Sequence, residues 1–239
     1  SRGWRVILGR PLQKRLLRKL DVEMFVATVQ PHPSPRPDLE QYTIPADIAA
    51  TMLYIAAYTY DDIAGKKVLD LGCGTGRLAL GAAFLGAEQV VGVDLDRTAV
   101  KVALENTKRT RLKTRPLWVA GDIDAVHGAF DTVLQNPPFG VQKRQADRRF
   151  LEKALETAKA VYSLHKRPQG NKRFIRELRG KRTGLASARG SYFLEEFIAY
   201  GGGRVKAVYP LLMTVPHMFD FHTKKKHEFA VDLYVIEKR

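Results

Sequence analysis

A short motif with two consecutive prolines, Asn136-Pro137-Pro138-Phe139, directly follows the apolar run AFDTVLQ and could orient an amino group for alkylation. The prolines hold the chain extended, and the asparagine amide offers a carbonyl acceptor. An exocyclic amine on a purine is a poor nucleophile because its lone pair is delocalised into the ring. If the carbonyls of Asn136 and Pro137 each accept one N–H bond, that lone pair can face an electrophilic methyl group. With Phe139 stacked on the base, the motif predicts methyl transfer to a planar NH₂ group without a strong general base.

A glycine-rich turn of the kind that approaches a ligand closely stands nearer the N-terminus, in the run DLGCGTG. Glycine lacks a Cβ and tolerates positive φ, so the backbone at Gly72 and Gly74 can meet a cofactor. The carboxylate of Asp70 would sit poorly beside a pyrophosphate but could anchor a cationic aminoacyl group. The turn therefore favours S-adenosyl-L-methionine (SAM) over a dinucleotide.

Two further carboxylates follow apolar runs and could bind the nucleoside part of the cofactor. Asp94 ends QVVGVDLD about 20 residues after the glycines, where a carboxylate can accept hydrogen bonds from both ribose hydroxyls. Asp96 competes for this role but could instead cap the next helix. After PLWVAG, the carboxylate of Asp122 could accept from the adenine amino group while Ile123 packs on the ring, or Asp122 could serve as a helix cap.

Strand and helix patterns alternate through the middle of the chain and place these residues at strand ends. The expected strands are KKVLDLG, QVVGVDLD, PLWVAGD and AFDTVLQ, and the expected helices are residues 45–58, TGRLALGAAFLGA, 97–109 and 150–161. This alternation predicts an α/β protein with a doubly wound, mostly parallel seven-stranded sheet, the class I SAM-dependent methyltransferase fold. The runs RVKAVYPLLMTVP and FAVDLYVIEKR predict a C-terminal antiparallel hairpin.

The chain is strongly basic, with a formal net charge of +15, which favours a polyanionic partner. Residues 1–37 are expected to form a basic N-terminal helix or arm and a proline-rich linker. Residues 38–239 form the expected methyltransferase domain, with a basic insertion at about 168–188. The arm could lie on RNA or pack its leucines on the core. The candidate RNA contacts are Lys166, Arg167, Lys224, Lys225 and Lys226.

Composition excludes several other classes. The one cysteine, Cys73, rules out an intrachain disulfide and a cysteine-rich zinc site, and the six histidines lack metalloprotease spacing, so no metal is expected. No run reaches the roughly 20 apolar residues needed to span a bilayer, and the N-terminus lacks the pattern of a secretory signal. We therefore expect a soluble, cytoplasmic protein.

Several motifs together resemble the methyltransferase-like protein 5 family, the small-subunit rRNA N6-adenosine methyltransferases of eukaryotes and their archaeal relatives. The motifs are LEQY at 39–42, NPPFG at 136–140, AVYSLHK at 160–166 (interpreted as the end of a helix), FH at 221–222 and KKK at 224–226. The resemblance implies methylation of adenosine N6 in small-subunit rRNA, with the adenine held by residues 136–139. It also implies a cofactor site lined by Gln41, Gly72, Thr75, Arg77, Asp94, Asp122 and Ile123.

The same resemblance implies a heterodimer with the small zinc-binding tRNA methyltransferase activator subunit 112, which adds to a sheet edge. Residues 116–119 are the third strand of a doubly wound sheet and hence its expected open edge. Trp118 is unusually large for this position and could meet the partner or face the adjacent helix. Because NPPF-like loops orient any planar NH₂ group, the alternatives are guanine-N2 methylation of RNA and glutamine methylation of a release factor. A non-catalytic RNA-binding subunit is a further alternative.

Overall fold

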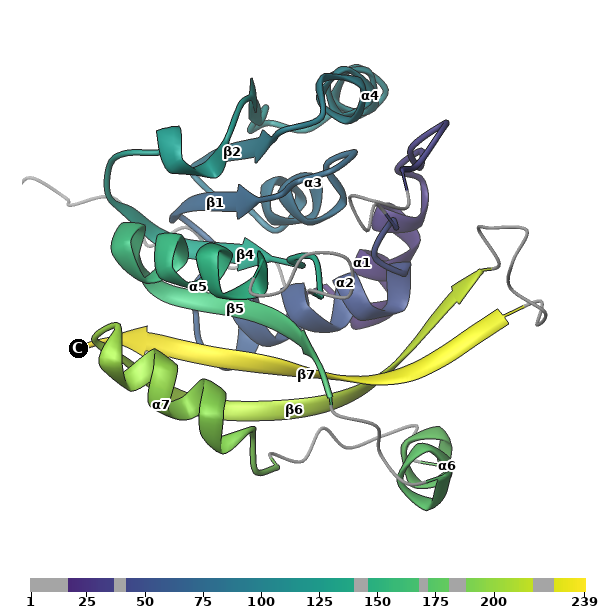
Figure 1. The fold of residues 1–239 in the computed structure, drawn as a ribbon. Helices are drawn as coiled ribbons and strands as arrows, with labels where there is room; N and C mark the ends of the chain where they lie inside the picture. The colour runs from purple at the N-terminus through teal and green to yellow at the C-terminus, as the bar shows by residue number, and fades with distance from the viewer. Residues whose placement is uncertain (1–16, 37–41, 140–145, 168–171, 181–187, 217–225) are drawn as a thin grey trace, which may run out of the picture.

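The computed structural model describes residues 17–36, 42–139, 146–167, 172–180, 188–216 and 226–239, which form a sheet with helices on both faces (Figure 1). The sheet has seven strands in the order β3-β2-β1-β4-β5-β7-β6. They are Lys67–Leu71 (β1), Gln89–Asp94 (β2), Leu117–Ala120 (β3), Phe130–Gln135 (β4), Ala158–Lys166 (β5), Gly203–Pro216 (β6) and Lys226–Lys238 (β7). Strands β1 to β5 are parallel to one another, and β7 is antiparallel to β5 and β6. The expected doubly wound, mostly parallel sheet with a C-terminal antiparallel hairpin is confirmed.

Helices cover the sheet in two layers. The helical segments are Lys19–Ala27 (α1), Ala46–Tyr54 (α2), Ile55–Thr59 (η2), Arg77–Phe84 (α3), Arg97–Lys108 (α4), Ile123–Ala125 (η3), Ala146–Thr157 (α5), Lys172–Gly180 (α6) and Tyr192–Tyr200 (α7). In Figure 1, α5 and α7 lie in front of the sheet, and α2 and α3 lie behind it. One hydrophobic cluster fills the layer with α1, α2 and α3, and a second fills the layer with α5 and α7.

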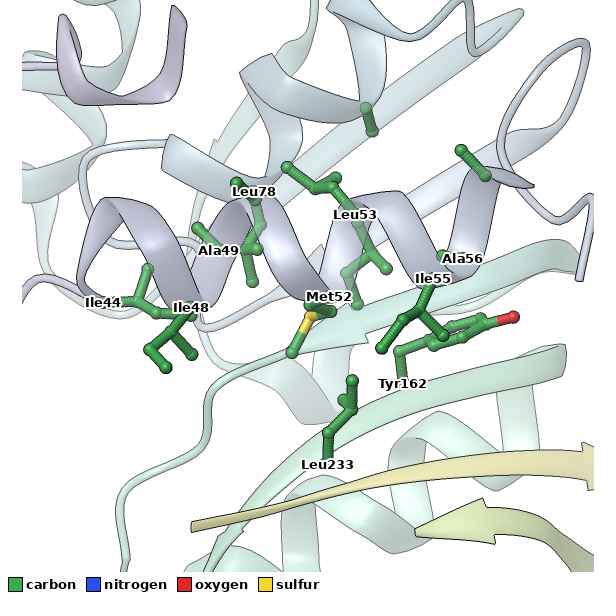
Figure 2. Close-up of a cluster of buried hydrophobic side chains, with 14 of the residues drawn as sticks. Ile44, Ile48, Ala49, Met52, Leu53, Ile55, Ala56, Leu78, Tyr162 and Leu233 are labelled. Carbon is green, nitrogen blue, oxygen red and sulfur yellow. The ribbon is translucent and has the colours of Figure 1, made fainter. Parts of the chain in front are cut away.

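Helix α2 forms because apolar residues recur on one helical face. Ile48 and Met52 are buried, and Ile55 continues the same face into η2. Pro45 stands at the N-cap with φ −56° and ψ 146°, a place where a backbone N–H would have no partner within the helix. Figure 2 shows Met52 and Ile55 directed toward Leu233 and Tyr162 of the sheet.

The interval from residue 150 to 166 corrects the sequence interpretation. The expected helix at 150–161, with AVYSLHK as its end, is wrong, because α5 ends at Thr157 and β5 begins at Ala158. Apolar residues keep a helical spacing across this junction, and neither Gly nor Pro marks it. Residues 161–165 are all buried, as in a central strand that is covered on both faces.

The described residues before the expected boundary at 38, residues 17–36, include a helix that packs against the main core. Helix α1 begins later than the basic helix expected in the second half of residues 1–20, of which 11–16 lie outside the described residues. Val22 and Val26 of α1 are fully buried in the cluster that α2 and α3 share. The following residues, 28–36, contain no helix or strand, as their prolines predict.

In the part of the chain that the structure describes, two helices follow β5. Helix α6 lies within the expected basic insertion, and α7, which the sequence interpretation lacks, leads into β6. Within the described ranges, no helix is long and apolar enough to cross a membrane. The same residues contain no group of His, Cys, Asp and Glu side chains that could hold a metal ion.

Candidate active site

The glycine turn lies between β1 and α3 and needs glycine at several positions. Gly72, Gly74 and Gly76 have φ of 70°, 53° and 92°, a region that other residues adopt only with strain. A Cβ on Gly76 would lie 2.4 Å from Cη2 of Trp118, and one on Gly72 would lie 2.9 Å from Cε1 of Phe150. A Cβ on Gly74 would meet nothing within 4 Å. The turn is thus packed from beneath at its two ends and open at Gly74, where a ligand can reach the backbone.

Asp70 lies beneath this turn. Its carboxylate accepts a hydrogen bond from the backbone N–H of Ala79 at 2.9 Å, and the residue is 1% exposed. Burial raises the pKa of Asp70 to about 7, and the nearby Asp94 carboxylate contributes to the rise. Asp70 therefore holds the start of α3 under the turn, and a cation bound nearby would favour its ionised form.

The two competing aspartates at the end of β2 have different partners. Asp94 accepts from the backbone N–H of Gly74 at 2.8 Å and from that of Asp96 at 2.9 Å. Burial raises the pKa of Asp94. Asp96 is the N-cap of α4 and accepts from Thr98 N at 2.7 Å, while its other oxygen lies 3.1 Å from Nε2 of His32. Asp94 is therefore the aspartate that contacts the glycine turn.

Thr75 and Arg77 connect the turn to the N-terminal segment. Asn106 of α4 donates to the carbonyl oxygens of Thr75 at 3.0 Å and Gln30 at 3.1 Å, and it accepts from Gln30 N at 3.1 Å. The Arg77 guanidinium donates to the carbonyl oxygens of Ile44 at 2.5 Å and Val29 at 3.1 Å. Burial lowers the pKa of Arg77. These contacts position the backbone around the turn.

Asp122 and Ile123 occupy the expected place after β3. Asp122 caps η3 by accepting from Asp124 N at 2.9 Å, and it pairs with Arg149 of α5. The Asp124 N–H, with Arg149 as a further cause, lowers the pKa of Asp122. Ile123 is buried in the α5 layer. Asp122 therefore caps a helix, as one of its two interpretations predicts. Contact of Asp122 and Ile123 with adenine stays a prediction.

The NPPF motif leaves β4 at the same sheet edge as the glycine turn. Leu71 and Gln135 are register partners, so the residues after them, Gly72 and Asn136, begin adjacent loops. The hydroxyl of Tyr42 donates to Oδ1 of Asn136 at 3.5 Å. Pro137 is buried, while Asn136, Pro138 and Phe139 are half-buried. The structure therefore brings the expected methyl-acceptor motif next to the expected cofactor turn.

Aromatic rings from two distant segments contact Phe139. Its ring stacks on Tyr42 with centroids 5.6 Å apart and an interplanar angle of 27°. The ring of Phe229 meets Phe139 edge-on, at 5.7 Å and 87°. A planar base entering beside Asn136 would therefore meet an aromatic wall.

A row of polar side chains, three of them buried, connects the end of β4 to β5 and to α5. Gln135 Nε2 donates to Ser163 Oγ at 2.8 Å, and Ser163 Oγ lies 2.8 Å from Nε2 of His165. Nδ1 of His165 is 3.7 Å from the carboxylate of Asp147 in the first turn of α5. The row links the residue before Asn136 to β5 and α5.

The expected RNA contacts divide into three groups. Lys166 is exposed at the end of β5, whereas Arg167 donates to Asp232 at 3.0 Å and to the carbonyl oxygen of Arg189 at 2.8 Å. Lys224 and Lys225 lie outside the described residues, as does the expected cofactor residue Gln41. Of Lys226 only the backbone is described, as the first residue of β7.

Sequence reasoning missed several residues that build the site, above all Asn106, Phe150 and Phe229. The sequence could have indicated Asn106, because it continues the helical spacing of Ala99 and Ala103 on the apolar face of α4. A polar residue on such a face needs a hydrogen-bond partner. No such signal exists for Phe150 or Phe229, since their neighbours come from distant segments.

Comparisons with known proteins agree with this geometry. The model of the methyltransferase small domain family matches residues 46–181. The rRNA N(6)-adenosine-methyltransferase Mettl5 of Drosophila melanogaster is 36% identical over 92% of this chain and 96% of its own length. The protein MJ0284 of Methanocaldococcus jannaschii is 34% identical over 93% of this chain and 95% of its own.

A solved structure gives the same result. The crystal structure of PH1948 from Pyrococcus horikoshii superposes with a TM-score of 0.75 at 34% identity, covering 93% of this chain and 98% of that one. The chain therefore belongs to the methyltransferase small domain family and, within it, to the group that contains the Drosophila rRNA N(6)-adenosine-methyltransferase Mettl5.

Proposed function

We propose that this protein transfers a methyl group from SAM to N6 of an adenosine in small-subunit ribosomal RNA. The observation that carries the proposal is the position of Asn136, whose loop starts beside the glycine turn and whose amide oxygen accepts from the Tyr42 hydroxyl at 3.5 Å. The family that the chain belongs to, with its Drosophila relative named as an rRNA N(6)-adenosine methyltransferase, supports the choice of acceptor.

The residues at the glycine turn fit SAM. Gly74 leaves room for a ligand at the backbone, Asp94 presents a carboxylate beside it, and Asp70 places a second carboxylate beneath the turn. These two groups suit ribose hydroxyls and a cationic aminoacyl group, respectively. When bound, SAM supplies an electrophilic methyl group on a sulfonium.

The chain's own contribution to the reaction is orientation. Asn136 Oδ1 and the carbonyl oxygen of Pro137 would each accept one N–H bond of the adenine amine, which turns the nitrogen lone pair toward the methyl donor. Phe139 would stack on the base once it is extruded from the RNA. Fixed acceptors of this kind favour the charge that develops on nitrogen during transfer.

Product analysis tests the proposal. The protein is incubated with methyl-labelled SAM and small-subunit rRNA, or with a release factor, and the digested nucleosides and peptides are examined by mass spectrometry. The expected product is labelled N6-methyladenosine. Labelled N2-methylguanosine or methylglutamine would instead support the alternative acceptors, and calorimetry without any SAM binding would support a non-catalytic RNA-binding role.

The proposal includes a partner at β3, the small zinc-binding tRNA methyltransferase activator subunit 112. Strand β3 is one of the two edge strands of the described sheet, and Leu117 and Val119 on it are 58% and 45% exposed. Trp118 faces the adjacent helix and not a partner, because its Nε1 donates to Thr107 of α4 at 2.9 Å. An edge with exposed apolar side chains suits strand addition by a partner.

A charge on the edge strand tests this partner. Leu117→Glu should abolish co-purification of the subunit, whereas Leu20→Glu on α1, also an exposed leucine, should retain it. Equal retention by both variants would place the partner elsewhere. The expected cytoplasmic location also remains part of the proposal, and cell fractionation tests it.

A further inference from the structure

The aromatic cluster at the acceptor motif continues past Phe139 to a pair of residues, Phe229 and Lys166, that do not orient the methylated amine in the reaction described above. Phe229 of β7 meets Phe139 edge-on at 5.7 Å, and the Lys166 ammonium lies over the Phe229 ring, 5.6 Å from its centroid. Phe229 is half-buried and Lys166 is exposed. The ring beside Phe139, which would stack on the target base, thus carries a cation over its own face.

Such a pair has the chemistry of a nucleotide subsite. Aromatic side chains stack on bases of any sequence, and lysine contributes a point charge for phosphate. A base that stacks on Phe229 would take the place of the ammonium over the ring, and the ammonium could then pair with the phosphate. Phe229 contacts Phe139 directly, and Lys166 contacts Phe229.

We propose that Phe229 and Lys166 form a subsite for the nucleotide next to the target adenosine, with Phe229 stacking on its base and Lys166 contacting the connecting phosphate. This inference rests on the proposed function, because it assumes that the target base stacks on Phe139. It assigns sequence-tolerant stacking to the neighbouring base, since neither residue reads a base edge.

Another cation–π pair of the structure provides a matched control. Lys206 lies over the ring of Tyr60, 5.2 Å from its centroid, near the start of β6. Strand β6 runs in the same direction as β5, so Lys206 lies toward the opposite end of the sheet from Lys166. Lys206→Gln removes the same charge from a similar pair without approaching the acceptor motif.

The experiment compares two small ligands, adenosine and the dinucleoside monophosphate of adenosine, by NMR titration of the purified protein. The wild type should bind the dinucleoside monophosphate about five- to tenfold more tightly than adenosine. This factor corresponds to the lower end of the affinity that one base gains by stacking on an aromatic side chain. Phe229→Ala should remove this preference, because any effect through Phe139 acts on both ligands alike, and should leave SAM affinity unchanged, while Phe229→Tyr should retain the preference.

The lysine has its own measurement. Lys166→Gln should lower the slope of log affinity against log salt for single-stranded RNA by about 0.7, whereas Lys206→Gln should leave the slope unchanged. A wild type without a preference for the dinucleoside monophosphate, or a Phe229→Ala variant that keeps it, overturns the subsite. Failure of the wild type to methylate rRNA while the preference persists would overturn the proposed function and leave Phe229 and Lys166 as a dinucleotide-binding site without a methylation target.

Discussion

The glycine turn and Asn136 lie in different surroundings. Around the glycine turn, carboxylates accept hydrogen bonds from backbone N–H groups, whereas near Asn136 aromatic rings pack against one another. Asp70 accepts a hydrogen bond from the backbone N–H of Ala79. Asp94 accepts from the backbone N–H groups of Asp96 and of Gly74, which belongs to the turn. On the acceptor side, Tyr42 and Phe229 contact Phe139 through ring faces and edges. Directional hydrogen bonds fix one geometry, while stacked rings accept a planar guest with little directional preference. We call the glycine turn with Asp70 and Asp94 the cofactor half, and Asn136 with the rings of Tyr42, Phe139 and Phe229 the acceptor half. The difference implies that the cofactor half is prebuilt and the acceptor half is adaptable.

The largest expected effect is on the acceptor half. Asn136→Ala should lower the rate of methyl transfer by about 100- to 1000-fold, because a fixed acceptor for the amine is lost at the reacting atom. SAM affinity, measured by calorimetry, should stay at the wild-type value since Asn136 is not part of the glycine turn. Turnover close to wild type would show that Asn136 does not orient the amine.

A pair of glycine substitutions tests the packing of the cofactor half. Gly76→Ala introduces a Cβ at φ 92° that would lie 2.4 Å from Trp118, and Gly65→Ala introduces one at φ 69° with nothing within 4 Å. Urea denaturation should show a loss of about 3 kcal/mol in unfolding free energy for Gly76→Ala and about 1 kcal/mol for Gly65→Ala. Equal losses would mean that the indole does not support the turn.

Asp70 gives the cofactor half a pH dependence. Its pKa is about 7 in the folded protein and near 3.8 for an unperturbed aspartate, so folding favours the protonated form. The contribution of Asp70 to the unfolding free energy is complete below about pH 4, declines as pH rises, and is lost above about pH 7. As the pH rises from about 4 to about 7, Asp70→Asn should therefore gain stability relative to the wild type. A constant difference across this interval would contradict the raised pKa.

The smallest expected effect concerns Asn106. Asn106→Ala leaves the carbonyl oxygens of Thr75 and Gln30 and the N–H of Gln30 without this partner. SAM affinity should fall by about tenfold, while the rate at saturating SAM should stay unchanged. A lower saturated rate with wild-type SAM affinity would instead assign Asn106 to the acceptor half.

The cofactor half was the more predictable from sequence. Its strands are short apolar runs that end in glycine or aspartate, so Asp70, the glycine turn and Asp94 follow from local pattern alone. The register of β1, β2 and β4 then brings these ends together without further information.

The acceptor half was less predictable because its contacts join distant segments. The apolar spacing hid the start of β5 at Ala158, and with it the position of Lys166 at a strand end. The contacts of Phe139 with Tyr42 and Phe229 depend on how three segments meet in space. Their apolar character was visible in the sequence, but their proximity was not.

Complementation in cells tests the central claim most directly. N6-methyladenosine in purified small-subunit rRNA is quantified by mass spectrometry in cells that lack the protein and in the same cells supplied with wild type or Asn136→Ala. One methylated adenosine should disappear without the protein, return with the wild type, and stay absent with Asn136→Ala at equal protein abundance. An unchanged N6-methyladenosine level in cells without the protein would contradict the assigned reaction.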